Sequence, residues 1–248
     1  MLKREGILLS SVRLGIACPM ANEGELGGKF VKEVLARCDG FREVRFFVVL
    51  DKVTKDNTRE LLDQLAGCEP RLCVVWAPEN RCVVDAYVRG YREALAWGAD
   101  WILEIDAGFS HQPGDVSQFF SAMAKGYDCV FGSRMMQGGS IVRSSFKRRL
   151  VSWGGTVLTN LLVGTDLTDM TSGFELFSRE ALQMVLDKGI QSRGHFFQTE
   201  IKVHCRSLRI GEVPITYKAA SARLTTASVR EAFYQLGRLF RLRCQGVL

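Results

Sequence analysis

Short apolar runs alternate with helical patterns along the first half of the chain. The candidate strands are residues 13–18, 44–50, 72–76, 101–105 and 129–132. Between them, apolar residues recur at helical spacing in residues 27–38, 58–65, 83–98 and 116–125. A regular alternation of strand and helix is typical of α/β proteins. The pattern therefore predicts an α/β fold with a mostly parallel central sheet and helices on both of its faces.

The pattern changes after about residue 135. A glycine-rich, basic loop at 135–143 leads into a helical pattern at 146–162 and then a turn-rich segment at 164–173. Further elements are predicted as strands at 174–177 and 209–213 and as helices at 179–186, 197–207 and 228–241. The chain has no internal repeat, low-complexity tract or long linker, so we expect one domain over residues 1–248.

Composition narrows the function classes. The 248 residues are 47% hydrophobic and 24% charged, with a net charge of +6, which is ordinary for a globular protein and favours a phosphate-bearing ligand or an anionic membrane surface. No motif of a nucleic-acid-binding protein is present. The eight cysteines form no Cys-x-x-Cys pair and only three histidines occur, so we expect reduced thiols and no zinc cluster.

Targeting signals are weak in this sequence. Residues 1–10 do not have the pattern of a signal peptide, and the longest uncharged stretch, 150–165, is too short and too polar for a spanning helix. We therefore expect a cytoplasmic protein.

The segment from Trp101 to Pro113 carries the most information. An apolar run ends in a single acid, Asp106, followed by small residues and then the proline. In open α/β sheets, ligands bind beyond the carboxyl ends of the strands, so an acid there is placed to serve a metal, a ribose or a phosphate-bearing substrate. The alternative is that Asp106 caps the next turn.

Other strand ends carry matching chemistry. Asp51 follows the second strand, Arg134 follows the fifth, and Asn22 and Glu23 follow the first strand after Pro19. Because the carboxyl ends of parallel strands meet at one edge of a sheet, these side chains are expected to lie near Asp106. Carboxylates beside an arginine that binds phosphate indicate a site for a nucleotide diphosphate.

Over about residues 12–235 the chain resembles family 2 glycosyltransferases, most closely the dolichol-phosphate (polyprenol-phosphate) mannose synthase branch. The matching motifs follow the family's order. They are Pro19 with Asn22-Glu23; Asp51 with Asp56-Asn57-Thr58; Asn80-Arg81; Asp106-Ala107-x-x-Ser110-His111-x-Pro113; Gly132-Ser133-Arg134 with Gly138-Gly139; Arg148 and Arg149 with Ser152; Asp169-x-Thr171-Ser172-Gly173-Phe174; Phe197-x-x-Glu200; and Gly211-x-Val213-Pro214-Ile215.

The resemblance implies a GT-A, Rossmann-like fold and an inverting hexosyltransferase. The donor would be a GDP- or UDP-sugar and the acceptor a polyprenyl or dolichyl phosphate, with Mg²⁺ or Mn²⁺ as cofactor. Residues of about 12–135 would bind the nucleotide sugar and those of about 136–227 would face the acceptor. The implied catalytic residues are Asp106, Arg134 and Glu200, and the implied metal ligands are Asp106 and Ser110. The implied substrate-binding residues are Pro19, Asn22, Glu23, Asp51, Asn80, Arg81, Arg148, Arg149, Ser152, Thr171, Ser172 and Arg223.

Three departures from the family pattern matter. The metal motif reads Asp106-Ala107-Gly108, so its second carboxylate is missing, and the next ligand position holds Ser110. The run Asp-Asp-Gly-Ser after the second strand is replaced by residues 50–53, which keep one acid, Asp51. The family's basic residues beyond Val-Pro-Ile are absent, and Arg223 is the nearest replacement.

Two other function classes stay open. The missing carboxylate also fits a catalytically weak, nucleotide-binding partner subunit. A nucleotidyltransferase shares the same strand-edge chemistry, but it would need a basic, glycine-rich loop after the first strand, where residues 19–25 are acidic.

The last predicted helix, residues 228–248 with its tail, is amphipathic and basic. Residues 229, 233, 236, 239 and 240 are apolar and share one side, and arginines at 230, 238 and 241 flank them. Such a helix lies on an anionic membrane surface, here the cytoplasmic face, or packs on its own domain.

Overall fold

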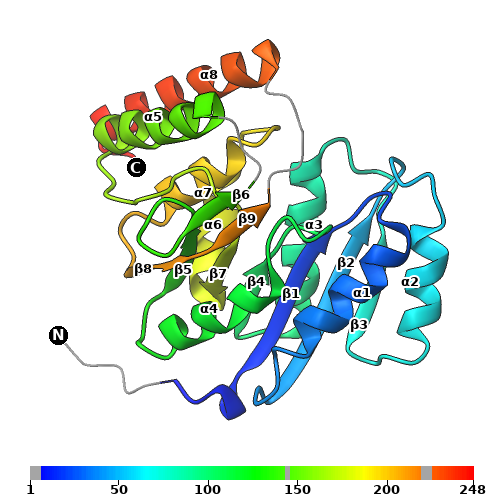
Figure 1. Ribbon diagram of the computed structural model, residues 1–248. Helices are drawn as coiled ribbons and strands as arrows, with labels where there is room; N and C mark the ends of the chain where they lie inside the picture. Colours follow the sequence, from blue (N-terminus) through cyan, green and yellow to red (C-terminus); the bar gives the residue numbers. More distant parts are fainter. Residues whose placement is uncertain (1–6, 143–145, 219–224) are drawn as a thin grey trace.

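Figure 1 shows the computed structural model of the chain, which describes residues 7–142, 146–218 and 225–248, with the backbone alone for residues 146–148. The strands are β1 (Arg13–Pro19), β2 (Glu43–Leu50), β3 (Leu72–Trp76), β4 (Trp101–Glu104), β5 (Cys129–Ser133), β6 (Ser140–Val142), β7 (Glu175–Ser178), β8 (Ile210–Pro214) and β9 (Thr216–Lys218). The helices are α1 (Gly24–Leu35), α2 (Thr58–Ala66), α3 (Val83–Trp97), α4 (Val116–Met123), α5 (Phe146–Val163), α6 (Arg179–Lys188), α7 (Phe197–His204) and α8 (Thr226–Cys244). Two short 3₁₀ turns are Leu9–Ser11 and Pro113–Asp115.

The central sheet has the strand order β3-β2-β1-β4-β7-β5-β8. Its pairs are parallel except where β7 runs antiparallel between β4 and β5. Strands from both predicted halves of the chain join this one sheet. The predicted mostly parallel sheet is confirmed.

The sequence analysis missed the pair β6 and β9. Each has three residues, which is too short to give a recognisable alternation of apolar and polar positions, and they pair in parallel across a long sequence separation. His111 bridges to Tyr217 of β9, so this small sheet reaches the loop after β4.

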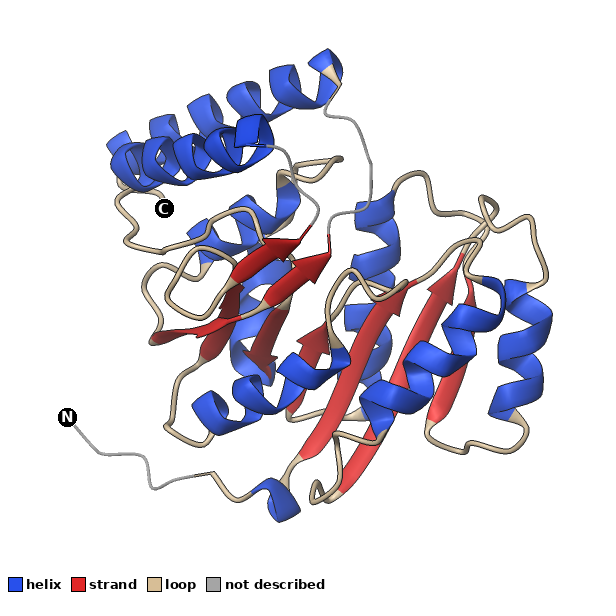
Figure 2. Cartoon of the chain, viewed as in Figure 1, coloured by secondary structure: helices blue, strands red, loops and turns tan. Residues whose placement is uncertain are grey.

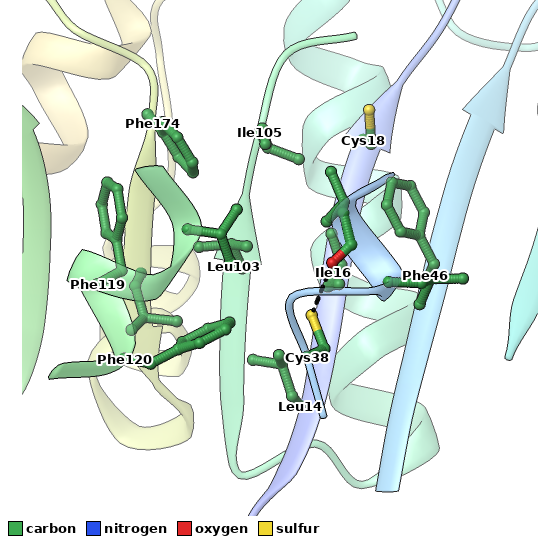
Figure 3. Close-up of a cluster of buried hydrophobic side chains, with 14 of the residues drawn as sticks. Leu14, Ile16, Cys18, Cys38, Phe46, Leu103, Ile105, Phe119, Phe120 and Phe174 are labelled. Carbon is green, nitrogen blue, oxygen red and sulfur yellow. Dashed lines mark hydrogen bonds between the residues drawn. The ribbon is translucent and has the colours of Figure 1, made fainter. Parts of the chain in front are cut away.

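Helices cover both faces of the sheet, as predicted (Figure 2). Successive strand residues point to opposite faces, so Ile16 and Phe46 pack with α1, α2 and α4, while Ala17 and Phe47 pack with α3, α6 and α7. Figure 3 shows the first of these clusters, in which Leu103 of β4 lies close to Phe120 of α4.

Helix α3 lies unusually close to β1. A Cβ atom at Gly15 would lie 2.7 Å from the Cβ of Ala94, a distance that real side chains do not adopt. Glycine at this strand position therefore lets the helix backbone approach the sheet closely. The approach brings the buried side chain of Tyr87 to the end of β4, where Asp106 follows.

Helices α5 and α8 pack side by side at the top of Figure 1. The prediction that α8 has one apolar side needs correction. Leu236 and Leu239 are buried against the domain, while Phe233 and Phe240 are exposed, so the apolar residues are divided between two faces. Among the described residues, no helix has both the length and the apolar content needed to cross a bilayer.

Candidate active site

The loops that follow β1 and β2 are tied together by Asn22. Its side-chain amide donates to the carbonyl of Val53 at 3.0 Å, and its side-chain oxygen accepts from the amide of Lys55 at 2.8 Å. Asn22 has a left-handed backbone, with φ of 56°, which asparagine tolerates better than most residues. In the second loop, Asp51 accepts from the amide of Val53 at 2.9 Å. Two of the predicted substrate-binding residues therefore meet at this sheet edge.

Glu23 is fixed at the start of α1 by Thr58. The buried Thr58 hydroxyl accepts hydrogen bonds from the amides of Glu23 and Gly24, each at 2.8 Å, and donates to Asp56 at 2.6 Å. Burial, and next the charge of Asp56, raises the pKa of Glu23. Its carboxylate lies against Gly108 in the loop after β4, because a Cβ there would lie 3.0 Å from Oε2. The loops after β1, β2 and β4 thus converge.

Asp106 lies just beyond β4, as the sequence predicted. Its carboxylate accepts a hydrogen bond from the Tyr87 hydroxyl, and its side chain is 34% exposed. Its amide donates to Nδ1 of His111 at 3.0 Å, so the proton of the neutral imidazole is on Nε2, which lies 3.8 Å from Asp106 Oδ2. Burial lowers the pKa of His111, which favours the neutral ring. Because a third of its side chain is exposed, Asp106 keeps an open side for a ligand.

Arg134 lies at the end of β5 and forms a buried ion pair with Asp169. Nε and Nη2 of Arg134 donate to the two carboxylate oxygens at 2.7 and 2.8 Å, and Nη2 also donates to Thr171 Oγ1 at 2.5 Å. Burial alone would raise the pKa of Asp169, but the hydrogen bonds and charge of Arg134 outweigh it and lower the pKa. The arginine is therefore a buried structural cation, and its role as a phosphate ligand stays a prediction.

Tyr217 of β9 joins the Asp106 and Arg134 groups. Its ring centroid lies 5.5 Å from the Arg134 guanidinium carbon and 5.3 Å from the centroid of the His111 ring. His111 in turn stacks on Phe174 at 4.9 Å. The ends of β4 and β5 thus form one continuous site.

Sequence reasoning missed Tyr87 and Tyr217 as parts of this site. Tyr87 lies in the helical pattern predicted at residues 83–98, where it occupies one of the apolar positions. A tyrosine on a buried helix face needs a hydrogen-bond partner for its hydroxyl, and that requirement was the available signal.

Glu200 does not fit the predicted catalytic role. Its buried carboxylate accepts from the amides of Gln191 and Ser192 and from the guanidinium of Arg238 on α8. Burial alone would raise the pKa of Glu200, but hydrogen bonds, those with His204 and Ser192 first, lower it to about 2. With its oxygens occupied in this way, Glu200 links the loop before α7 to α8, which is a structural role.

This role predicts a pH-dependent stability. The pKa of Glu200 in the folded chain, about 2, lies below its ordinary value of 4.5, so its contribution is complete above pH 4.5 and is lost as the pH falls towards 2. Glu200→Gln should lower the free energy of unfolding by on the order of 3 kcal/mol at pH 7 and by much less at pH 3. Urea unfolding at both pH values measures this, with the exposed Glu180→Gln as control. An equal loss at both pH values would contradict the assignment.

The remaining predicted substrate-binding residues lie after β3 and on α5. Asn80 is buried after β3, and its side-chain nitrogen has no partner among the described residues, so a ligand acceptor would satisfy it. Arg81 is exposed and donates to Asp85. Arg149 donates to the carbonyl of Ile141 at 2.7 Å.

For the other predicted site residues, the structure gives only a backbone contact or a position. The Ser110 carbonyl accepts from the amide of Lys218, and the Ser172 carbonyl from Lys202. Pro19 ends β1, and Ser152 is half-buried on α5. The side chain of Arg148, and Arg223 as a whole, lie outside the described residues.

A layer of buried polar side chains surrounds the end of β4, two residues before Asp106. Glu104, the last residue of β4, accepts from Tyr91 and Gln198, and its register partner Glu175 pairs with Lys202 at 2.5 Å. Burial, and next the charge of Glu175, raises the pKa of Glu104 well above its ordinary value. This layer fixes the end of β4 and was not predicted from sequence.

The described residues contain no group of three or more His, Cys, Asp or Glu side chains arranged to hold a metal ion. Asp106 with an open side, and Glu23 against Gly108, offer carboxylate oxygens of the kind that Mg²⁺ and Mn²⁺ prefer. These residues fit an ion that takes its other ligands from a bound diphosphate and water, as Mg²⁺ commonly does.

Comparison with known proteins agrees with the motifs. Residues 16–186 match the family described as Glycosyl transferase family 2. An undecaprenyl-phosphate mannosyltransferase of Micrococcus luteus is 32% identical over 172 residues, covering 68% of this chain and 70% of the relative. A polyprenol monophosphomannose synthase of Mycolicibacterium smegmatis is 28% identical over 208 residues, covering 79% of this chain and 78% of the relative. The resemblance expected from the sequence is confirmed.

Solved structures agree on the fold. Glucosyl-3-phosphoglycerate synthase from Mycobacterium tuberculosis, in complex with Mg²⁺ and UDP, has a TM-score of 0.69 at 17% identity, covering 93% of this chain and 80% of that chain. The same enzyme with Mn²⁺, UDP and phosphoglyceric acid has a TM-score of 0.65 at 15% identity, covering 94% of this chain and 78% of that chain. The predicted GT-A fold is confirmed.

Proposed function

Because this chain belongs to glycosyl transferase family 2 and is therefore a glycosyltransferase, we propose that it transfers a hexose, with inversion, from a GDP- or UDP-sugar to a polyprenyl phosphate. The observation that carries this proposal is the open side of Asp106, at the sheet edge where the loops carrying Glu23 and Asp51 converge. The unpaired donor of buried Asn80, at the neighbouring strand end, supports a bound nucleoside.

A divalent ion bound at Asp106 would neutralise the diphosphate as it leaves the sugar. Mg²⁺ or Mn²⁺ is supported by the bound ions of the M. tuberculosis synthase. Arg134 supplies positive charge on the other side of the site, beyond Tyr217. We assign it to the phosphates of donor or acceptor, together with Thr171, which shares its guanidinium.

The charges in the site support a phosphate acceptor. A phosphate monoester already carries the negative oxygen that attacks the anomeric carbon, so no strong protein base is required. In keeping with this, Glu200 is bound in structural contacts and His111 is neutral. Positioning and charge neutralisation would supply most of the rate. The activities named for the M. luteus and M. smegmatis relatives support a polyprenyl phosphate and mannose.

Helix α5 supports a lipid acceptor because its apolar residues face outward. Thr156 and Thr159 are buried, whereas residues on the opposite side are exposed at helical spacing. The exposed apolar residues of α5 are Leu150, Val151, Trp153, Val157 and Leu161. Exposed apolar side chains gathered on one side of a helix mark membrane or protein contacts.

Helix α8, which packs beside α5, also exposes apolar residues. Val229, Phe233, Tyr234 and Phe240 are exposed there, and the exposed Arg230 and Arg241 lie among them. Aromatic rings beside arginines are the composition of a helix in the headgroup region of an anionic bilayer. We name the exposed apolar residues of α5 and α8, with Arg230 and Arg241, the α5–α8 face. We infer that it rests on the cytoplasmic surface of the membrane.

This surface predicts salt-sensitive binding to vesicles. Arg238 is a poor probe because it is bonded to Glu200 and Gln235, so the charge variant is Arg230→Glu with Arg241→Glu. Each arginine near an anionic membrane contributes about 1 kcal/mol of binding free energy. The double variant should therefore weaken binding to phosphatidylglycerol vesicles by about tenfold or more. Vesicle sedimentation measures the partition coefficient.

The apolar variant is Trp153→Ser with Phe233→Ser, which should also reduce binding. The matched control is Leu8→Ser, an exposed leucine just before the 3₁₀ turn Leu9–Ser11 and outside both helices. Wild-type protein that stays in solution with anionic vesicles at low salt would exclude the membrane role and leave a protein partner for the α5–α8 face.

The transferase activity is tested with a panel of nucleotide sugars, including GDP-mannose and UDP-glucose, each with Mg²⁺ or Mn²⁺. The acceptors are a polyprenyl phosphate and 3-phosphoglycerate, and the readout is release of nucleoside diphosphate. We expect release that depends on the polyprenyl phosphate. Nucleotide binding without release would favour the second candidate, a catalytically weak partner subunit, which Gly108 motivates. The nucleotidyltransferase alternative loses support because the family match, residues 16–186, includes Glu23, Asp51, Asp106 and Arg134.

A further inference from the structure

The loop after β4 has a backbone that disfavours a side chain at residue 108. Gly108 and Phe109 are both left-handed, with φ of 69° and 59°. A Cβ at residue 108 would lie 3.0 Å from Oε2 and 3.1 Å from Oε1 of Glu23. Real Cβ atoms are rarely this close to other atoms, so a side chain at 108 would displace Glu23. The carboxylate of Glu23 therefore lies beside the position from which the family motif projects its second carboxylate.

The surrounding contacts hold Glu23 in this position. Its backbone amide is bonded to the fully buried Thr58, which fixes the start of α1. On the other side, the Phe109 ring packs edge-on against Phe30 of α1 at 5.3 Å. Both the acid and the loop that it faces are thus anchored to the same helix.

The Glu23 carboxylate also lacks a cation. Among the described residues, none donates a hydrogen bond to it or forms an ion pair with it, although it is half-buried. Other acids in the site are already bonded: Asp56 to Thr58, and Asp169 to Arg134. Glu23 therefore has carboxylate oxygens available to a ligand, and they lie against Gly108, two residues from Asp106.

We propose that Glu23 supplies the second carboxylate for the donor-bound divalent cation, in place of the acid that Gly108 lacks. The pair Asp106 and Glu23 then does with residues from the loops after β4 and β1 what the family motif does within one loop. This inference rests on the proposed glycosyl transfer, because the diphosphate of the donor completes the coordination. It also gives a reason for glycine at 108, since an aspartate there would strain the backbone and place a second negative charge against Glu23.

The test is direct Mn²⁺ binding without turnover. Electron paramagnetic resonance counts free Mn²⁺ in the presence of GDP or UDP, for wild type, Glu23→Gln and Asp106→Asn. Glu23→Gln should weaken Mn²⁺ binding by about tenfold or more, because even groups that only orient metal ligands contribute about 10–100-fold. The exposed Glu25→Gln, two residues away on α1, should bind as wild type does.

A carboxylate exchange makes the test sharper. Gly108→Asp alone should bind Mn²⁺ no better than wild type, whereas Glu23→Ala with Gly108→Asp should bind it more tightly than Glu23→Ala alone. Loss of binding in Asp106→Asn but not in Glu23→Gln would overturn this inference and leave the proposed function standing. Wild type that binds no Mn²⁺ with either nucleotide would overturn both.

Discussion

Asp106→Asn is expected to lower turnover by about 10²–10³-fold or more, the range seen when one group that stabilises transition-state charge is removed. The loss follows from the position of the carboxylate, which lies beyond β4 with one oxygen held by Tyr87 and an open side towards the donor. Asparagine has the same shape and still accepts from Tyr87, and the backbone amide still donates to His111. The variant should therefore fold normally.

Two comparisons make this result specific. Asp187→Asn removes one negative charge from an exposed position on α6 and should leave turnover unchanged. Addition of a chelator should abolish wild-type turnover and change little in Asp106→Asn. If Asp106→Asn turned over as fast as wild type, or if a chelator did not affect wild-type turnover, Asp106 would not belong to the proposed metal site.

Arg134→Ala should lower the free energy of unfolding by about 3–5 kcal/mol, because it leaves a charged Asp169 buried without its partner. The side chains of Arg134 and Asp169 are 9% and 0% exposed. A matched control exists in Arg71, which makes the same two-point contact with Glu69, at 2.9 and 2.8 Å, near the surface. Arg71→Ala should cost at most about 1 kcal/mol. Urea unfolding measures both.

A double variant separates the structural role of Arg134 from its proposed phosphate role. Arg134→Met with Asp169→Leu removes both buried charges and should recover much of the lost stability. Its transferase activity should stay at least tenfold below wild type, roughly what one charged hydrogen bond of 1.5–3 kcal/mol contributes. Activity that recovers along with stability would assign Arg134 to structure alone.

The strand-helix alternation was sufficient to predict the sheet, because each buried strand carries a continuous apolar run. The same signal could not give strand direction. Residues 174–177 read as an ordinary strand, yet β7 runs antiparallel between β4 and β5. Periodicity also could not say which side of a helix faces solvent. In α5 the threonines at 156 and 159 point inward and Trp153 and Leu161 point outward, which only packing reveals.

The candidate site was predictable where a side chain follows a strand directly. Asp106 and Arg134 were found in this way. Pairings across the chain were not predictable, because Arg134 and Asp169 are 35 residues apart and periodicity gives no information on which acid an arginine meets. Glu200 was assigned a catalytic role from its motif, while its partners on α8 and in the preceding loop indicate a structural one.

The central claim is that this chain attaches a hexose to a polyprenyl phosphate in a membrane. The direct measurement incubates wild-type protein with a radiolabelled nucleotide sugar, Mg²⁺ and anionic vesicles that contain polyprenyl phosphate, and then follows label into the organic phase. We predict a lipid product in which the sugar is bonded through phosphate with inverted anomeric configuration, and no product with Asp106→Asn. Label that stays in the aqueous phase with every donor, or that joins a water-soluble acceptor equally well, would contradict the claim.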